Sequence, residues 1–198
     1  AMILAGSLAA ASAKLNINGT SGAFSAGVVG VMLFPLVVRA FGIIASLIGI
    51  AMVSVKGDED PMNALNRGYR LTAVLAMIGF GGGSYWLLNN PALPDAWWKF
   101  FICGIIGILT SVAFVYITQY YTEYRYRPVQ EIARASITGP ATNIISGIAV
   151  GLECTALPFF AISIPILASY KLGLSAIPGG GLFGTAVATM GMLATAGY

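Results

Sequence analysis

The chain has 198 residues, 58% of them hydrophobic and only 9% charged, and its mean hydropathy is +0.85. This composition excludes an ordinary soluble globular domain and indicates a polytopic membrane protein. The net charge of +3 is small, and the Lys and Arg residues lie mostly between apolar runs, which excludes a basic nucleic-acid-binding domain.

Six apolar runs follow one another along the chain, separated by polar or glycine-rich turns. A spanning helix needs about 20 residues, and the first and last runs are shorter than that. We therefore expect an internal fragment of a longer protein, with four complete spans and a partial span at each end, forming one all-α transmembrane helix bundle. The expected spans are 1–13 (partial), 27–55, 71–88, 98–121, 141–170 and 182–198 (partial), within a single domain fragment that covers residues 1–198.

Prolines and small residues indicate where these spans bend or pack closely. Pro35 is expected to bend the 27–55 span, a distortion that membrane helices tolerate. Small residues at helical spacing let the backbones of neighbouring membrane helices approach each other. We expect such contacts at Gly81–Gly83, at Gly104, Gly107 and Ser111, and along the face formed by Gly184, Ala188, Gly191 and Thr195.

The basic residues predict the orientation of the bundle, because Lys and Arg accumulate in cytoplasmic loops. The connectors 56–70 and 122–140 are therefore expected to be cytoplasmic, so that the spans 27–55 and 98–121 run inward. These two connectors hold Lys56, Arg67, Arg70, Arg125, Arg127 and Arg134, whereas the opposite side holds Lys14, Lys99 and Lys171.

Two ionisable residues, Arg39 and Glu153, are predicted to lie deep inside spans. At 1.5 Å per residue, each is roughly 18 Å from the membrane surface at which its span begins, in a core about 30 Å thick. Charged side chains at such depth are costly and rare. We predict that the two residues form a structural charge pair between helices. One alternative is that the two residues form a step in an ion pathway. Another is that each has a separate partner outside this chain.

The sequence contains no catalytic or metal-binding constellation. There is no His, and Cys103 and Cys154 both fall in apolar runs, so neither a zinc site nor a disulfide framework is expected. The acidic cluster Asp58–Asp60 is expected to be a solvated turn. Gly179–Gly181 precedes a helix and could bind an anion, but the lack of a nearby cation favours a simple turn. We assign no catalytic, cofactor-binding or metal-binding residues.

Three stretches carry a resemblance to a known family. They are FPLVVRAFGIIASLIGI at 34–50, YRPVQEIARASITGPATNIISGIAVGLECTALP at 126–158 and GLFGTAVATMGMLATAGY at 181–198. In this order, and over nearly the whole chain, the sequence resembles the membrane-bound, ion-pumping inorganic pyrophosphatases. One departure is Cys154, where the family usually has Ser.

The resemblance implies a location within a much larger bundle. By this resemblance, the chain corresponds to the end of the sixth helix, the seventh to tenth helices and most of the eleventh, in a single domain of roughly sixteen helices. Arg39 and Glu153 match positions in outer helices, which favours a structural role. The family's Asp-rich substrate motifs belong before Ala1 and beyond Tyr198, so no catalytic residue is carried over.

The resemblance also implies an activity for the parent protein. The family hydrolyses magnesium pyrophosphate on the cytoplasmic side and moves H⁺ or Na⁺ outward, commonly as a homodimer, with Mg²⁺ as cofactor and K⁺ as a possible activator. We expect a bacterial or archaeal cell membrane as the location and no nucleic-acid partner. The fragment alone is expected to be inactive scaffold. The alternatives are a fragment of a secondary transporter and a non-catalytic membrane assembly subunit.

Overall fold

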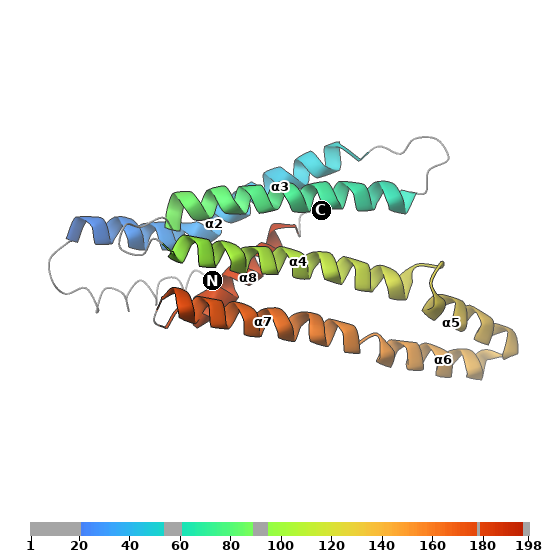
Figure 1. Ribbon diagram of the computed structural model, residues 1–198. Coiled ribbons are helices and arrows are strands. Elements are labelled where there is room, and N and C mark those ends of the chain that lie inside the picture. The colour runs from blue at the N-terminus through green and yellow to red at the C-terminus, as the bar shows by residue number, and fades with distance from the viewer. Residues whose placement is uncertain (1–20, 54–60, 89–94, 178, 196–198) are drawn as a thin grey trace. The chain divides into compact units, whose positions relative to one another are not determined.

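The computed structural model describes residues 21–53, 61–88, 95–177 and 179–195, and each regular element in these ranges is an α-helix. Four helical stretches are long and apolar enough to cross a membrane, so the predicted all-α transmembrane fold is confirmed. The partial span 1–13, Lys14, Lys56, Asp58–Asp60 and residues 196–198 lie outside the described residues. The helices are α2 (Ser21–Ala51), α3 (Pro61–Leu88), α4 (Ala96–Thr122), α5 (Arg127–Thr138), α6 (Pro140–Glu153), α7 (Ala156–Ala176) and α8 (Gly181–Ala194) (Figure 1).

The helix α3 begins at Pro61, whereas the predicted apolar span begins at Leu71. Proline suits the first turn of a helix, because its φ angle is already helical and the N–H it lacks would have no partner there. The first turns of α3 are polar, and the Arg70 Nε donates a hydrogen bond to the Asn66 carbonyl oxygen at 3.3 Å. Hydropathy therefore marks where the apolar residues begin, but the helix starts earlier.

The connector predicted at 122–140 contains a helix of its own, α5, which packs against α6. The two helices are joined by Gly139 alone, whose φ of 133° is a conformation that favours glycine. Pro140 then takes the first position of α6. The Thr142 hydroxyl donates to the carbonyl oxygens of Ala135 (3.1 Å) and Gly139 (2.9 Å), which ties the two helices together. Together α5 and α6 form a helical hairpin.

The single run predicted at 141–170 is interrupted at Cys154 and Thr155, between α6 and α7. Pro158 explains the position of the interruption, because proline has no N–H to donate to the carbonyl four residues earlier, and its ring clashes with that carbonyl. The Thr155 hydroxyl instead donates to the Leu152 carbonyl oxygen at 2.8 Å. Pro165, by contrast, lies inside α7.

The chain forms two compact units. The first contains residues up to 109 and residues from 165 onward, and the second contains residues 110–164. The helices α4 and α7 contribute residues to both units, whereas α2, α3 and α8 belong to the first and α5 and α6 to the second.

Aromatic side chains form the core of the first unit. The helix α2 packs against α3 and α8, and Figure 1 shows α2 and α3 side by side. Phe34 of α2 meets Phe80 of α3 edge to face, with ring centroids 5.6 Å apart, and Phe100 of α4 meets Phe183 of α8 in the same way at 4.9 Å. All four rings are almost completely buried. Such pairs add about 0.5–1.5 kcal/mol each beyond the burial of their area.

The small residues of α8 pack closely against α4 and α7, as the sequence predicts. A side chain at Gly191 would meet the backbone of Gly104, and one at Gly107 would meet the backbone of Ala188. Gly184 lies against the backbone of Ser169 and Gly173 in the same manner. Gly184, Ala188, Gly191 and Thr195 are all buried. The predicted slim face of α8 is therefore a contact face.

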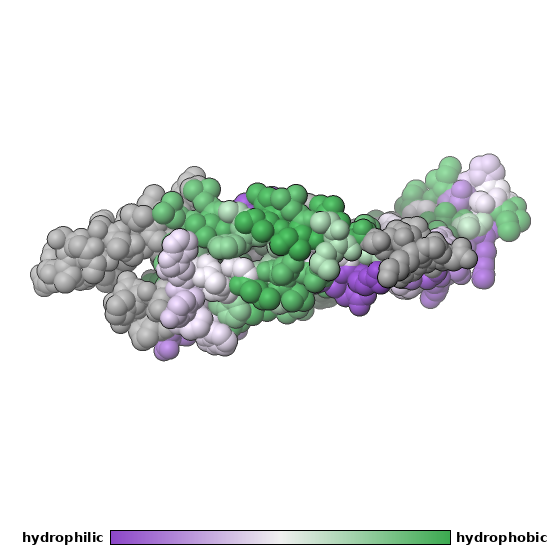
Figure 2. All heavy atoms as spheres, turned by 90° about the horizontal axis from the view of Figure 1, so that it is seen from above, coloured by the Kyte–Doolittle hydropathy of each residue, from purple (hydrophilic) through white to green (hydrophobic). Residues whose placement is uncertain are grey.

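The outer surface of the helices is strongly apolar. Large hydrophobic side chains such as Leu47, Ile78 and Trp86 are more than half exposed. Figure 2 shows hydrophobic residues over much of the coloured part of the visible face, together with separate patches of hydrophilic residues. Such a surface suits contact with lipid tails or with further membrane helices rather than with water.

Candidate functional site

Arg39 lies in the middle of α2 and binds the carboxyl-terminal part of α8. Its Nη1 donates a hydrogen bond to the carbonyl oxygen of Leu193, a residue 154 positions away in the chain. One turn later on α2, Gly42 packs directly against the backbone of Ala194. Because the guanidinium and the glycine contact neighbouring residues of α8, this stretch of α2 attaches α8 by both a charged donor and a close backbone approach.

Glu153 is the last residue of α6 and its side chain is exposed. On the face of α6 that carries Glu153, Asn143 and Ser146 are half-buried and Val150 is buried, whereas Ile144 and Ile148 on the other faces are exposed. Glu153 is followed directly by Cys154 and Thr155, which separate α6 from α7.

The predicted pair of Arg39 and Glu153 remains a prediction. Arg39 belongs to the first compact unit and Glu153 to the second. In the first unit, Arg39 donates to the Leu193 carbonyl oxygen. This contact gives Arg39 a physical role that does not require the pair.

The turn between α4 and α5, Tyr120–Arg127, combines tyrosines with cations, and we refer to it as the tyrosine-arginine turn. The Tyr120 ring contacts the rings of Tyr121 and Tyr126, with centroid distances of 5.0 and 5.3 Å. The Arg125 guanidinium carbon lies 5.9 Å from the Tyr124 ring centroid, within the range of a cation–π contact. The turn is thus an aromatic cluster with cationic groups at its rim.

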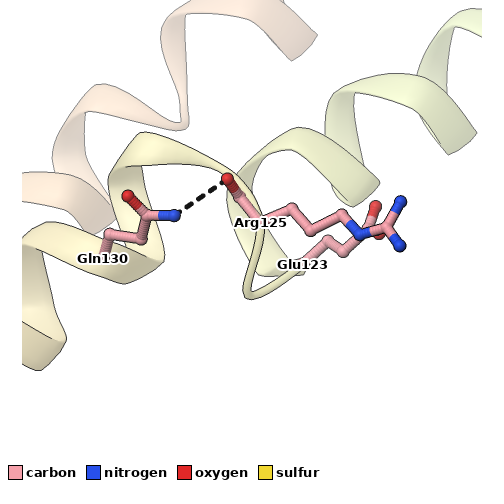
Figure 3. A network of polar contacts seen from close by, with 3 residues as sticks. All are labelled: Glu123, Arg125 and Gln130. Atoms are coloured by element: carbon pink, nitrogen blue, oxygen red, sulfur yellow. Dashed lines mark hydrogen bonds and ion pairs between the residues drawn. The ribbon is translucent and has the colours of Figure 1, made fainter.

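Polar contacts hold the tyrosine-arginine turn to α5. In Figure 3 the Gln130 side chain points back toward the turn, and its Nε2 donates to the Arg125 carbonyl oxygen at 3.0 Å. Arg125 Nε lies 3.9 Å from Glu123 Oε1, and Arg127 Nε lies 2.7 Å from Glu131 Oε1. The Arg127–Glu131 pair follows from its four-residue spacing, whereas nothing in the sequence indicated the Gln130 contact. An exposed helical pair of this kind contributes little to stability, so its role is local ordering.

Clusters of metal-ligating side chains are absent from the described part of the chain. In these ranges no group of three or more His, Cys, Asp or Glu side chains could hold one. Magnesium requires oxygen ligands arranged octahedrally, usually including one or two carboxylates and several waters. No step through Mg²⁺ is derived from the described residues.

Comparison with known proteins gives a consistent result. The family described as inorganic H+ pyrophosphatase matches residues 1–198. The K(+)-insensitive pyrophosphate-energized proton pump 2 of Moorella thermoacetica is 61% identical over 173 residues, which are 87% of this chain and 25% of the relative. The pyrophosphate-energized membrane proton pump 3 of Arabidopsis thaliana is 47% identical, over 100% of this chain and 25% of its own length.

A further relative is covered more completely. The pyrophosphate-energized proton pump 2 of Mycoplana dimorpha is 38% identical over 172 residues, which are 84% of this chain and 79% of that sequence. The chain spans about a quarter of the length of the Moorella and Arabidopsis relatives. Because the family match extends over all 198 residues, the chain belongs to the inorganic H+ pyrophosphatase family.

Proposed function

We propose that the chain is part of a membrane pump that hydrolyses inorganic pyrophosphate and uses the released free energy to move protons. The observation that carries this proposal is the family match along residues 1–198, together with 61% identity to a relative named as a pyrophosphate-energized proton pump. It favours a pump over a secondary transporter or a non-catalytic assembly subunit.

Within the pump, the role of this segment is to hold helices in place. Hydrolysis of pyrophosphate is a phosphoryl transfer to water, which metal ions catalyse by neutralising developing charge and which depends on groups that orient the water. The described ranges contain no carboxylate cluster for that task. They do contain the glycine contacts that seat α8 between α4 and α7. The segment by itself is therefore inactive scaffold.

The transported ion is H⁺ rather than Na⁺ in this proposal, and K⁺ is not required. Support comes from the relatives' names, which specify proton pumping and, in the Moorella protein, insensitivity to K⁺. Mg²⁺ is the cofactor of the parent pump through residues other than those described. The parent is a homodimer in a bacterial or archaeal cell membrane, with 56–70 and 122–140 on the cytoplasmic side.

A chimeric pump tests the function. The 173 matched residues of the Moorella pump are replaced by the corresponding residues of this chain, and inverted membrane vesicles are prepared. We expect phosphate release from pyrophosphate and acidification of the vesicle interior, both without added K⁺. An uncoupler should abolish the acidification and leave hydrolysis intact. The purified 198-residue chain should release no phosphate.

Two partial grafts serve as controls, one carrying α2–α4 and one carrying α5–α8. The amount of each graft in the membrane is compared with the amount of the parent pump, which distinguishes poor insertion from lost activity. If the full graft and both partial grafts insert normally and none hydrolyses pyrophosphate, the proposed function is wrong. Hydrolysis without acidification would refute proton pumping, and phosphate release by the isolated chain would refute the scaffold role.

A further inference from the structure

The position of the membrane boundary along α6 and α7 can be inferred from the second compact unit. The helical stretch Pro140–Ala176 has 37 residues. At 1.5 Å per residue it is about 55 Å long, whereas the hydrocarbon core is about 30 Å thick. A large part of the stretch must therefore lie outside the core, and hydropathy alone does not say which part.

The helix α7 by itself is long enough to cross the core. Its 21 residues, Ala156–Ala176, extend about 31 Å. Near its carboxyl end, in the first unit, Lys99 Nζ donates to the Ser175 carbonyl oxygen at 2.5 Å, and Lys99 follows the contacting rings of Trp97 and Trp98. Tryptophan and lysine in this arrangement are typical of the head-group layer. One membrane surface is thus marked at the carboxyl end of α7.

The other end of α7 adjoins the charged residues of the second unit. Glu153 ends α6, and Cys154 and Thr155 separate it from α7. The charged helix α5 packs against α6, so if α6 lay in the middle of the core, α5 and the turn before it would lie there too. Glu123, Arg125, Arg127, Glu131 and Arg134 would then all enter the hydrocarbon together with an irregular turn. Both charged side chains and irregular backbone are strongly disfavoured in contact with lipid tails.

We propose that the inner membrane surface crosses this unit at the tyrosine-arginine turn and at the Cys154–Thr155 interruption, so that the α5–α6 hairpin projects into water. The partner of the turn is the phospholipid head-group layer. Tyr124 is 68% exposed and Tyr126 is 41% exposed, and tyrosine prefers this layer because its ring is apolar and its hydroxyl is polar. Glu153 then lies at the membrane surface.

The cost of placing the apolar side chains of α6 in water does not argue against this position of the membrane surface. Ile144, Ile145, Ile148 and Leu152 are exposed, and hydropathy assigns them to the membrane. On the insertion scale, however, an aliphatic residue gains only a small fraction of what a charged residue loses at the helix centre. Moving four aliphatic side chains out of the core therefore costs less than moving the five charged side chains of the turn and α5 into it.

Depth measurements on nitroxide labels test the proposal in the full-length pump, reconstituted in lipid bilayers. Cys103→Ala and Cys154→Ser remove the native thiols, and single cysteines are placed at five consecutive positions of α6 (144–148) and of α7 (159–163). Five consecutive positions sample every face of a helix, so the most accessible label in each set reports the surrounding medium. Collisions with a water-soluble nickel chelate are compared with collisions with oxygen.

We expect the most accessible α6 label to be relaxed mainly by the nickel chelate, and the most accessible α7 label mainly by oxygen. Ile137→Cys, at the tip of the hairpin and 86% exposed, is the aqueous reference. An α6 label relaxed mainly by oxygen would overturn the proposal. Because the measurement reports depth and not turnover, it can fail while the proposed pump function stands.

Discussion

Replacement of Gly107 by alanine tests whether α8 depends on a close backbone contact with α4. Gly107 lies inside α4, and an added Cβ would fall on the carbonyl oxygen of Ala188 and only 3.0 Å from the amide nitrogen of Met192. Both atoms belong to the backbone of α8, so no side-chain rotation can relieve the clash. The helix α8 would have to move away from α4 as a whole.

Gly82→Ala is the matched control, because a Cβ at Gly82 meets nothing within 4 Å. Both glycines lie in helix interiors, where alanine is favoured over glycine by about 1 kcal/mol. That gain is common to the two variants and cancels in their comparison. The remaining difference is the overpacking at Gly107, for which about 1–3 kcal/mol is expected. Gly107→Ala should therefore be the less stable variant by that amount.

Thermal unfolding of the detergent-solubilised full-length protein, followed by tryptophan fluorescence, measures the difference. All variants are heated at one rate, because irreversible unfolding makes the midpoint depend on the rate. We expect a lower midpoint for Gly107→Ala than for wild type, and a midpoint at or above wild type for Gly82→Ala. Equal midpoints for the two variants would refute the close packing of α8 on α4, and a lower midpoint for the control would do so more strongly.

The remaining predictions concern orientation and the two charged residues. Glu131→Cys should react with an impermeant thiol reagent only from the cytoplasmic side and Asp95→Cys only from the outside, because the basic residues concentrate in the inner connectors; the reverse pattern would invert the assigned orientation. Arg39→Met should destabilise the protein by about 1.5–3 kcal/mol, the range for a hydrogen bond from a charged group, since the Leu193 carbonyl oxygen loses its donor. If Arg39 also pairs with Glu153 in a dry setting, loss of either partner should cost about 3–5 kcal/mol and the double variant less than the sum. Additive losses in the double-mutant cycle would exclude the pair.

Composition and residue spacing were enough to predict the class of the protein and some contact faces of its helices, although Gly82, predicted to lie in a close contact, has nothing within 4 Å of an added Cβ. Composition is enough for the class, since a chain this poor in charge and this rich in apolar residues cannot form a soluble surface. The contact faces follow from the geometry of a helix, because residues three and four positions apart share a face. Gly104 and Gly107, and Gly184, Ala188 and Gly191, could therefore be recognised as close-packing faces before their partners were known.

The limits of the helices and the contacts of the charged residues became known only from the folded chain. Hydropathy averages over apolar content, whereas helix limits depend on local backbone chemistry: Pro61 starts α3 within a polar stretch, Gly139 turns the chain between α5 and α6, and Pro158 separates α6 from α7. The partner of Arg39, in turn, lies 154 residues away on α8. Contacts of that kind depend on how whole helices pack against one another, and the local pattern around a residue carries no information about them.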